Sequence, residues 1–264
     1  MDAYNNNYIY LVRNDGATTL MTTSSRQQWY TEDSQMMNVC GAYSPSTNSY
    51  IWCIGNDNNA YYKKTYTDTS WIKVNVSSYI DISTYSYSID PYSTSYAYIV
   101  RSDGMINRLG TSGLQVSSSN WTYGYATDML KCSSTYSSSS AIRVGCIGKD
   151  GFYYYRDDYD TTTAYIKTPS ISKLESLLDS NSWIDMYSTT HTDIIQTDGT
   201  NMYNSHFNYN SSPSWYTSNI PGGGVKTCTS GGNLTNNYCI GNDNKLYYKS
   251  YSSTSWTSTS VTVN

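Results

Sequence analysis

A short motif returns at a constant interval along this chain of 264 residues, and it limits the possible folds more strongly than any other feature. The motif Cys-Ile-Gly-x-Asp begins at Cys53, Cys146 and Cys239, so consecutive copies are 93 residues apart. A second series, which ends in Asp-Gly, lies about halfway between these copies. A constant period over a whole chain is the signature of a repeat fold, in which each unit buries its apolar surface against its neighbours.

The aspartates of the two series divide the chain into blocks of similar length. Consecutive aspartates are separated by 42 to 48 residues, which is the length of one blade of a β-propeller. Each is followed by Gly or Asn, the residue types that best tolerate the positive φ of a tight hairpin turn. The six aspartates are Asp15, Asp57, Asp103, Asp150, Asp198 and Asp243.

Strand-like segments flank each of these turns. An apolar segment such as 50–54 precedes the turn, and a tyrosine-rich segment such as 60–63 follows it. An outer strand that usually opens with tryptophan comes next, and an inner strand such as 79–83 or 183–187 precedes each hairpin. The sequence therefore predicts an all-β fold, a single domain over residues 1–264. We expect a six-bladed β-propeller of four-stranded antiparallel blades, arranged as three tandem two-blade repeats.

The two ends of the chain complete this prediction. Only a few residues precede the first apolar strand at 8–12, so the first blade lacks an inner strand. A strand at 261–264 is left over after the outer strand of the last blade. We expect this C-terminal strand to pair into the first blade as its innermost strand, which closes the ring and leaves no open sheet edge there.

Six cysteines occur in three pairs, one pair in every second blade, and none forms a CxxC motif. Each pair falls on neighbouring antiparallel strands, where the Cα atoms come within bridging distance. This predicts the disulfides Cys40–Cys53, Cys132–Cys146 and Cys228–Cys239. Three disulfides indicate an oxidising compartment and favour a secreted protein; a cytoplasmic protein with free thiols is the alternative.

One segment departs from the strand pattern. Ser172-Lys-Leu-Glu175 has the form of a capping box and introduces Leu174, Leu177 and Leu178. We expect a two-turn helix here, as a linker between the fourth and fifth blades.

Charge and hydropathy exclude several classes of partner. The net charge is −4 and no Lys/Arg cluster is present, which argues against nucleic acid and against an anionic membrane surface. No apolar run reaches the roughly 18 residues of a membrane-spanning helix. The 31 tyrosines take over the packing role that Val, Ile and Phe have in ordinary strands.

The strand 50–57 (Tyr-Ile-Trp-Cys-Ile-Gly-Asn-Asp), then Tyr61-Tyr62, then 70–74 (Ser-Trp-Ile-Lys-Val) resembles the tectonin repeat. The resemblance covers essentially the whole chain at the level of blades, although the tryptophan of the second strand survives only as Trp52. Tectonin-type propellers, such as tachylectin-1 and fish egg lectins, are lectins that bind lipopolysaccharide or glycans. The resemblance implies a non-enzymatic, multivalent carbohydrate-binding protein that recognises cell-surface or microbial glycans.

Two sets of residues are the candidate sugar contacts. The tryptophans that open the outer strands present flat rings to the apolar face of a sugar, or they pack between neighbouring blades. Arg13, Arg101 and Gln196 stand at equivalent positions before the Asp-Gly turns, and all three donate hydrogen bonds to hydroxyls. The outer-strand tryptophans are Trp29, Trp71, Trp121, Trp215 and Trp256, with Tyr165 in the remaining blade.

No metal or cofactor site is predicted. The acidic stretch Asp157, Asp158 and Asp160 lacks the spacing of a calcium loop, and His191 and His206 have no obvious third ligand. The turn aspartates themselves serve local backbone hydrogen bonds in a hairpin, or else sugar hydroxyls. Sequons for N-glycosylation occur at Asn75, Asn120, Asn210 and Asn233.

Two other functions remain as alternatives to a lectin. A glycosidase needs paired carboxylates, but the only glutamates are Glu32 and Glu175, and the repeated features are spread evenly over the blades. A structural or adhesive matrix protein is compatible with the tyrosine and serine content, and it would assemble without inhibition by soluble sugars. The sequence favours the lectin, and no enzyme activity is expected.

Overall fold

The computed structural model of the chain is built almost entirely from β-strands. Its described part contains β1 to β23 and a single 3-10 turn, η1 (Pro221–Gly223), and no α-helix. The predicted helix around residues 172–178 lies outside the described residues. The structure describes residues 1–3, 8–30, 37–43, 50–91, 93–114, 121, 129–136, 142–157, 165–168, 182–186, 191–208, 214–230 and 236–263.

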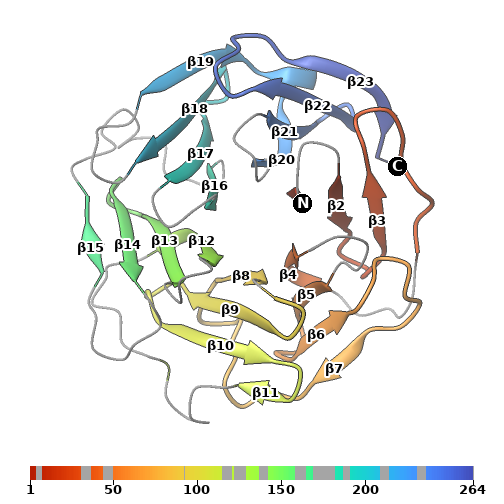
Figure 1. Cartoon of the computed structure of the whole chain (residues 1–264), viewed down its shortest axis with the longest axis vertical. Coiled ribbons are helices and arrows are strands. Elements are labelled where there is room, and N and C mark those ends of the chain that lie inside the picture. The colour runs from red at the N-terminus through yellow and green to blue at the C-terminus, as the bar shows by residue number, and fades with distance from the viewer. Residues whose placement is uncertain are drawn as a thin grey trace.

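Six antiparallel sheets follow one another around a ring (Figure 1), and we number them 1 to 6 in chain order. Sheets 2 to 6 have four strands each, as predicted for propeller blades, whereas sheet 1 has three strands. In each four-stranded sheet the chain runs from an inner strand beside the axis to an outer strand at the rim. The fold is thus an all-β propeller with five four-stranded blades. The prediction of six such blades was wrong, because sheet 1 has only three strands.

The odd-numbered sheets are 1, 3 and 5. Sheet 1 contains β1 (Asp2–Ala3), β2 (Ile9–Val12) and β3 (Thr18–Met21). Sheet 3 contains β8 (Tyr87–Pro91), β9 (Tyr96–Arg101), β10 (Ile106–Gly110) and β11 (Gly113–Leu114). Sheet 5 contains β16 (Ser182–Met186), β17 (His191–Thr197), β18 (Asn201–Asn208) and β19 (Trp215–Asn219).

The even-numbered sheets are 2, 4 and 6. Sheet 2 contains β4 (Met37–Tyr43), β5 (Tyr50–Gly55), β6 (Ala60–Lys63) and β7 (Ile72–Val74). Sheet 4 contains β12 (Met129–Tyr136), β13 (Ile142–Gly148), β14 (Tyr153–Asp157) and β15 (Ile166–Lys167). Sheet 6 contains β20 (Val225–Ser230), β21 (Asn236–Gly241), β22 (Lys245–Ser250) and β23 (Thr257–Thr262).

Sheet 1 differs from the prediction at both ends of the chain. Its innermost strand is β1, at the N-terminus, which pairs Asp2 with Tyr10. The C-terminal strand β23 pairs instead with β22 and stays in sheet 6, so the predicted closure by residues 261–264 is wrong. Met1 to Ala3 already fill the inner position, so no place is left there for β23. At the outer edge of sheet 1, two isolated bridges join β3 to Arg26 and Tyr30.

The inner strand of sheet 3 also differs from the prediction. Residues 79–83 were expected to form it, but β8 begins only at Tyr87. The Asp81 carboxylate accepts the backbone N–H groups of Ser83 and Thr84 at 3.0 and 3.3 Å, which holds this segment in a turn. The inner strand predicted at 183–187 is confirmed as β16.

All six hairpin turns have the backbone conformation that the sequence predicts. The residue after each turn aspartate has φ between 64° and 86°, in the left-handed region that only Gly and Asn adopt readily. The six residues are Gly16, Asn58, Gly104, Gly151, Gly199 and Asn244.

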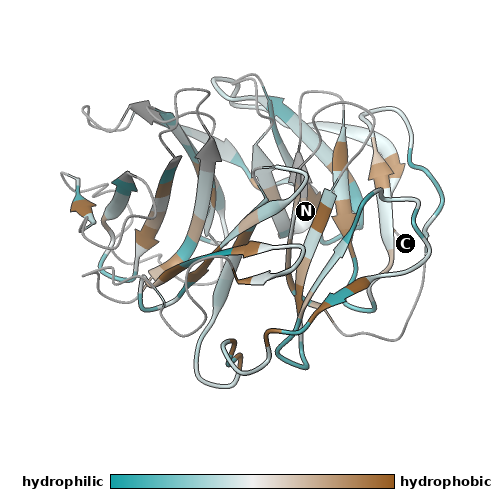
Figure 2. Cartoon of the chain, turned by 60° about the horizontal axis from the view of Figure 1, so that its bottom comes forward, coloured by the Kyte–Doolittle hydropathy of each residue, from teal (hydrophilic) through white to brown (hydrophobic). Residues whose placement is uncertain are grey.

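The hydrophobic core is divided among the interfaces between neighbouring sheets. One cluster joins Tyr98 and Ile106 of sheet 3 to Met129 and Cys146 of sheet 4. Several tyrosines are completely buried, which confirms their predicted packing role. Figure 2 shows that strongly apolar residues occupy only short stretches of the strands, with paler and teal stretches between them. Packing between sheets, assisted by tyrosine, therefore holds the ring together.

The three predicted disulfides are all present. Cys40–Cys53, Cys132–Cys146 and Cys228–Cys239 each join directly opposed residues of an inner strand and its neighbour, with Cα atoms 4.1 Å apart. All three lie in even sheets. The two-blade repeat of the sequence is therefore also a repeat of covalent structure.

Candidate binding sites at the rim and on the axis

The turns that join the second and third strands of the sheets form one face of the ring, which we call the hairpin face. In sheet 1 this face carries two predicted contact residues, Arg13 and Trp29, beside the turn aspartate Asp15. Arg13 forms an ion pair with Asp15, and its guanidinium lies 5.1 Å from the centre of the Trp29 ring. Burial alone would raise the pKa of Asp15, but hydrogen bonds from Arg13 and Ala17 outweigh it and hold the pKa below its usual value. Both charged side chains remain over 40% exposed.

Sheet 3 repeats this arrangement in a more enclosed form. Arg101 donates two hydrogen bonds to Asp103, from Nε at 2.9 Å and from Nη2 at 2.5 Å. Its guanidinium lies 4.2 Å from the Tyr85 ring and 5.2 Å from the Trp121 ring. A fork-like pair of this kind fixes the guanidinium in one orientation. The Arg101 side chain is only 15% exposed.

Sheet 5 does not provide a third copy. Gln196 is buried at 1% exposure, lies inside β17, and donates from Nε2 to Ser182 Oγ at 3.2 Å. The reason is a different hydrogen bond across the turn. In sheets 1 and 3 the backbone N–H groups of Arg13 and Arg101 donate to the carbonyl four residues ahead. In sheet 5 the N–H of Asp198 donates to the Asn201 carbonyl instead. The structure therefore brings Arg13 and Arg101 to equivalent places and leaves Gln196 apart from them.

The outer-strand tryptophans mostly pack between sheets. Trp71 and Trp121 are each 8% exposed, and their indole N–H groups donate to the carbonyls of Gly16 and Tyr79. Trp256 is partly buried and donates to Ser218 Oγ of sheet 5 at 2.9 Å. Trp29 and Trp215 are also partly buried and pack against core clusters. Only the partly buried rings keep surface that a ligand could reach.

Sequence reasoning missed a set of buried cations in the even sheets. Lys63 and Arg156 are 0% exposed and Lys249 is 2% exposed, and each follows its turn aspartate by six residues. Lys63 Nζ lies 4.8 Å from the Trp71 ring, and Lys249 Nζ lies 5.5 Å from the Trp256 ring. The signal was present in the sequence, because each cation ends the same Tyr-Tyr-Lys/Arg run.

Two of these cations, Lys63 and Lys249, reach into the preceding odd sheet. Lys249 Nζ donates to Asn204 Oδ1 of sheet 5 at 2.5 Å and to the Ser253 carbonyl at 2.7 Å. Lys63 Nζ donates to Thr18 of sheet 1 at 3.4 Å. Burial lowers the pKa of Lys249 to about 8, because desolvation disfavours the charged ammonium. Sheets 2 and 6 are thereby attached to sheets 1 and 5, which precede them.

The turn aspartates of the even sheets are engaged in local contacts. Asp57 accepts hydrogen bonds from the Tyr61 hydroxyl at 2.6 Å and from Lys73 Nζ at 3.0 Å. Burial alone would raise the pKa of Asp57, but these bonds and those from Asn59 lower it to about 2. Asp150 and Asp243 also accept a tyrosine hydroxyl, at 2.6 and 2.7 Å. This supports the reading in which these aspartates shape the turns.

A cavity of about 520 Å³ lies at the axis of the ring. Its walls come from the inner strands β4, β8, β12, β16 and β20, together with Met1 and the turn after β2. The side chains Arg13, Lys131, Lys226, Asp90, Asp185 and Trp183 contribute to the wall. All six sheets therefore contribute to this cavity.

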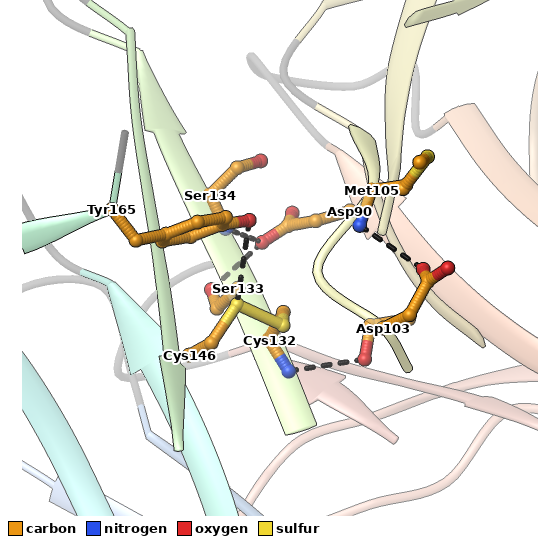
Figure 3. The surroundings of a disulfide bond; sticks show 9 residues. Asp90, Asp103, Met105, Cys132, Ser133, Ser134, Cys146 and Tyr165 are labelled. Atoms are coloured by element: carbon orange, nitrogen blue, oxygen red, sulfur yellow. Dashed lines mark hydrogen bonds between the residues drawn. A yellow bond between two sulfur atoms is a disulfide. The ribbon is translucent and has the colours of Figure 1, made fainter. Parts of the chain in front are cut away.

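The inner strands are held to each other by side chains around this cavity. Asp90 Oδ2 of sheet 3 accepts the Ser133 hydroxyl at 2.7 Å and the Ser134 backbone N–H at 2.6 Å, both from sheet 4. Figure 3 shows these contacts beside the Cys132–Cys146 disulfide. Ser133 also accepts the backbone N–H of Met186 in sheet 5 at 3.1 Å. Side chains of one sheet thus cap the edge N–H groups of the next.

Other sequence features are placed as follows. His191 and His206 stack with ring centres 4.9 Å apart, and His206 Nδ1 lies 2.9 Å from the buried Asp193. Asn75 is the only sequon asparagine within the described residues, and it is exposed. Over the part of the chain that the structure describes, no group of three or more metal-ligating side chains occurs. Over the same part, no helix is long and apolar enough to cross a membrane.

Comparison with known proteins supports the fold alone. No protein-family model and no curated protein matches the sequence. The chain is similar to the solved structure of YCF48 bound to D1 peptide, with a TM-score of 0.53 and 14% identity, over 97% of this chain and 80% of that one. It is also similar to the WD40 domain of SCAP from fission yeast, with a TM-score of 0.48 and 11% identity, over 98% and 68% of the two chains.

Proposed function

We propose that this protein is a non-enzymatic, multivalent carbohydrate-binding protein. The observation that carries the proposal is the pair of Arg–Asp–aromatic clusters on the hairpin face, Arg13–Asp15–Trp29 and Arg101–Asp103–Tyr85, whose rings are only partly buried. Each holds a guanidinium, which only donates hydrogen bonds, beside an aromatic ring. Sugars combine hydroxyls that accept such bonds with an apolar C–H face that packs on aromatic rings. The tectonin-like sequence pattern supports the same ligand class.

Repetition of the sites gives the function its physical logic. Two weak sites on one rigid ring bind a surface that displays many glycans more tightly than either site alone, by roughly 10² to 10⁴.

We further propose that sheet 1 serves as a sixth blade, since Arg26 and Tyr30 bridge its outer edge. Because three disulfides are retained best under oxidising conditions, we place the protein outside the cell, where such glycans are displayed.

The test is a glycan array with the purified protein, followed by titration calorimetry on the best ligand. We expect two sites per chain, one at each cluster. Arg13→Ala and Arg101→Ala should each remove one site, and the double variant should no longer agglutinate glycan-coated beads. Lys64→Ala, an exposed cation away from both clusters, is the matched control and should behave as wild type.

Two results would count against the proposal. An array without any hit, together with sugar-insensitive self-assembly, would favour the structural or adhesive alternative. Full binding by the double variant would place the sites elsewhere on the ring.

A further inference from the structure

The axial cavity differs in chemistry from the two clusters on the hairpin face and shares only Arg13 with them. Two lysines line it near the hairpin face, Lys131 from β12 and Lys226 from β20. Both side chains are exposed to the cavity, and among the described residues neither forms an ion pair with a carboxylate. Lys226 donates to the amide oxygen of Asn244. This end of the cavity therefore carries two positive charges that are not neutralised by the protein.

The charge changes sign further along the axis. Lys131 is paired with Ile147, three residues before the turn aspartate of its sheet, whereas Asp90 is paired with Tyr98, five residues before its own. At about 3.3 Å per residue, Asp90 lies roughly 7 Å deeper than Lys131. Asp185 of sheet 5 lines the same depth, where Thr229 Oγ1 of sheet 6 donates to it at 3.4 Å. The cavity is thus cationic at its mouth and anionic within.

The wall at the level of Lys131 is partly apolar, because Trp183 is paired with Ile195, three residues before the turn aspartate of its own sheet. Trp183 of β16 contributes to it and is only partly buried. A volume of about 520 Å³ is within the range of small-molecule sites, roughly 300 to 1,000 Å³. A simple anion would satisfy the lysines but would be repelled by the deeper carboxylates. A ligand with a carboxylate at one end and hydroxyl donors at the other matches both levels.

We propose that the axial cavity is a single site for an acidic monosaccharide. The sugar carboxylate binds Lys131 and Lys226, its hydroxyls donate to Asp90 and Asp185, and its C–H face packs on Trp183. This inference takes its ligand class from the proposed function but uses different residues. If one acidic sugar of a glycan binds on the axis while other sugars of the same chain reach the clusters on the hairpin face, the protein would select acidic glycans over neutral ones.

The probe is D-glucuronate, titrated into the intact protein by calorimetry, with D-glucose and sodium acetate as separate ligands. We expect one site per chain for glucuronate, and binding at least tenfold weaker for glucose and for acetate. Equal binding of acetate and glucuronate would mean that the lysines hold a bare anion, and it would overturn the assignment of a sugar. No binding of glucuronate would overturn the site itself.

Variants assign the site to the axis. Lys131→Gln and Lys226→Gln should each weaken glucuronate binding about tenfold, and the double variant should abolish it. Lys64→Gln is the matched control. Both cavity lysines are exposed, so the substitutions should not change the midpoint of thermal unfolding. An unchanged midpoint would show that the variants are folded.

The two proposals fail in distinguishable ways. Arg101 does not line the cavity, so Arg101→Ala should leave glucuronate binding intact while it removes its own site on the hairpin face. If Arg101→Ala loses glucuronate binding and the lysine variants keep it, the axial site is wrong and the hairpin-face clusters bind the acid. If glucuronate binds on the axis but no glycan binds at the clusters on the hairpin face, the proposal of a multivalent lectin is wrong and the axial site is still supported.

Discussion

Even and odd sheets of this ring have diverged to very different extents. The even sheets are close copies of one another, since each has a cross-strand disulfide, an aspartate–tyrosine contact at its turn and a buried cation six residues later. The odd sheets share little beyond the hairpin. At one paired position on their second and third strands they carry Tyr10 with Leu20, Tyr98 with Arg108, and Asp193 with His206.

This contrast separates support from recognition. Each even sheet is cross-linked internally by its disulfide, and Lys63 and Lys249 hold the preceding odd sheet through buried contacts, as Lys249 does through Asn204. Odd sheets that are held in this way can change their polar side chains without loss of the fold. In sheet 3, Arg108 lies 4.8 Å from the Tyr96 ring, and in sheet 5 the corresponding His206 stacks on His191 at 4.9 Å. The same geometry thus accommodates different chemistry.

The largest effect should come from the disulfides, if the even sheets are the support. Replacement of both cysteines by alanine in any one pair should destabilise the protein by about 3 kcal/mol, because each bridge closes a loop of similar length. The sequence separations are 13, 14 and 11 residues. Chemical denaturation of the three double variants measures this. Losses that differ by more than twofold would show that the even sheets are not equivalent.

Gly41 tests the contact between an even sheet and the odd sheet that follows. A Cβ atom added there would lie 2.6 Å from the Ile89 carbonyl oxygen and 2.7 Å from Pro91 Cδ. Gly41→Ala should therefore cost about 2 kcal/mol through overpacking, measured as a fall in the denaturation midpoint. Lys64→Ala, which is exposed, should cost little. A neutral Gly41→Ala would mean that sheets 2 and 3 can separate without penalty.

The buried cations predict a pH dependence that distinguishes sheet 6. The pKa of Lys249 is about 8 in the folded protein and about 10.4 when unfolded. Above pH 8 the unfolded chain therefore binds more protons, so stability should rise with pH, by on the order of 1–2 kcal/mol between pH 8 and 9.5. Below pH 8 the penalty of burying the charge is fully present.

The matched variant is Lys249→Arg, because Arg156 already occupies the equivalent position in sheet 4. Arginine does not titrate in this range, so the rise in stability above pH 8 should disappear. Unfolding free energies measured at several pH values decide the matter. A rise that persists in Lys249→Arg would have to come from another group.

The smallest effect should separate the two rim clusters. Arg101 is more enclosed than Arg13, with side-chain exposures of 15% and 45%. Arg101→Ala should therefore lower the free energy of unfolding by about 1 kcal/mol. Arg13→Ala should lower it by less, at the lower end of the roughly 0–1 kcal/mol that exposed ion pairs contribute. Thermal unfolding measures both, and a reversed order would remove the distinction between an enclosed and an open cluster.

The sequence was sufficient for the features that repeat. The 93-residue period, the turn residues and the cysteine pairs all depend on local geometry, and the structure confirms them. The inner strand of sheet 3 and the closure of the ring were predicted wrongly. In each case two segments have a similar strand pattern, and only one of them pairs as the inner strand beside the axis. Tertiary packing decides which segment does so, and the local sequence pattern does not show it.

The candidate sites show the same limit. Arg13 and Arg101 were found from their spacing to the turn aspartates, whereas Gln196 has that spacing but lies in a strand that continues one residue further. The axial side chains Asp90, Lys131, Trp183, Asp185 and Lys226 were missed because they come from four separate strands. The recurring Ile-Asp pairs, at Asp90 and Asp185, were the available signal.

The placement of β1 and β23 has an evolutionary consequence. Because the N-terminal strand stays in sheet 1 and the C-terminal strand stays in sheet 6, every sheet is encoded by one uninterrupted stretch of the gene. The seam between the two ends is held by side-chain packing and by a hydrogen bond from Arg26 Nε to the Thr262 carbonyl, and none of the described strands crosses it. Duplication or deletion of a 93-residue unit would therefore add or remove whole sheets without cutting one in half, so rings of other sizes are accessible in a single genetic step.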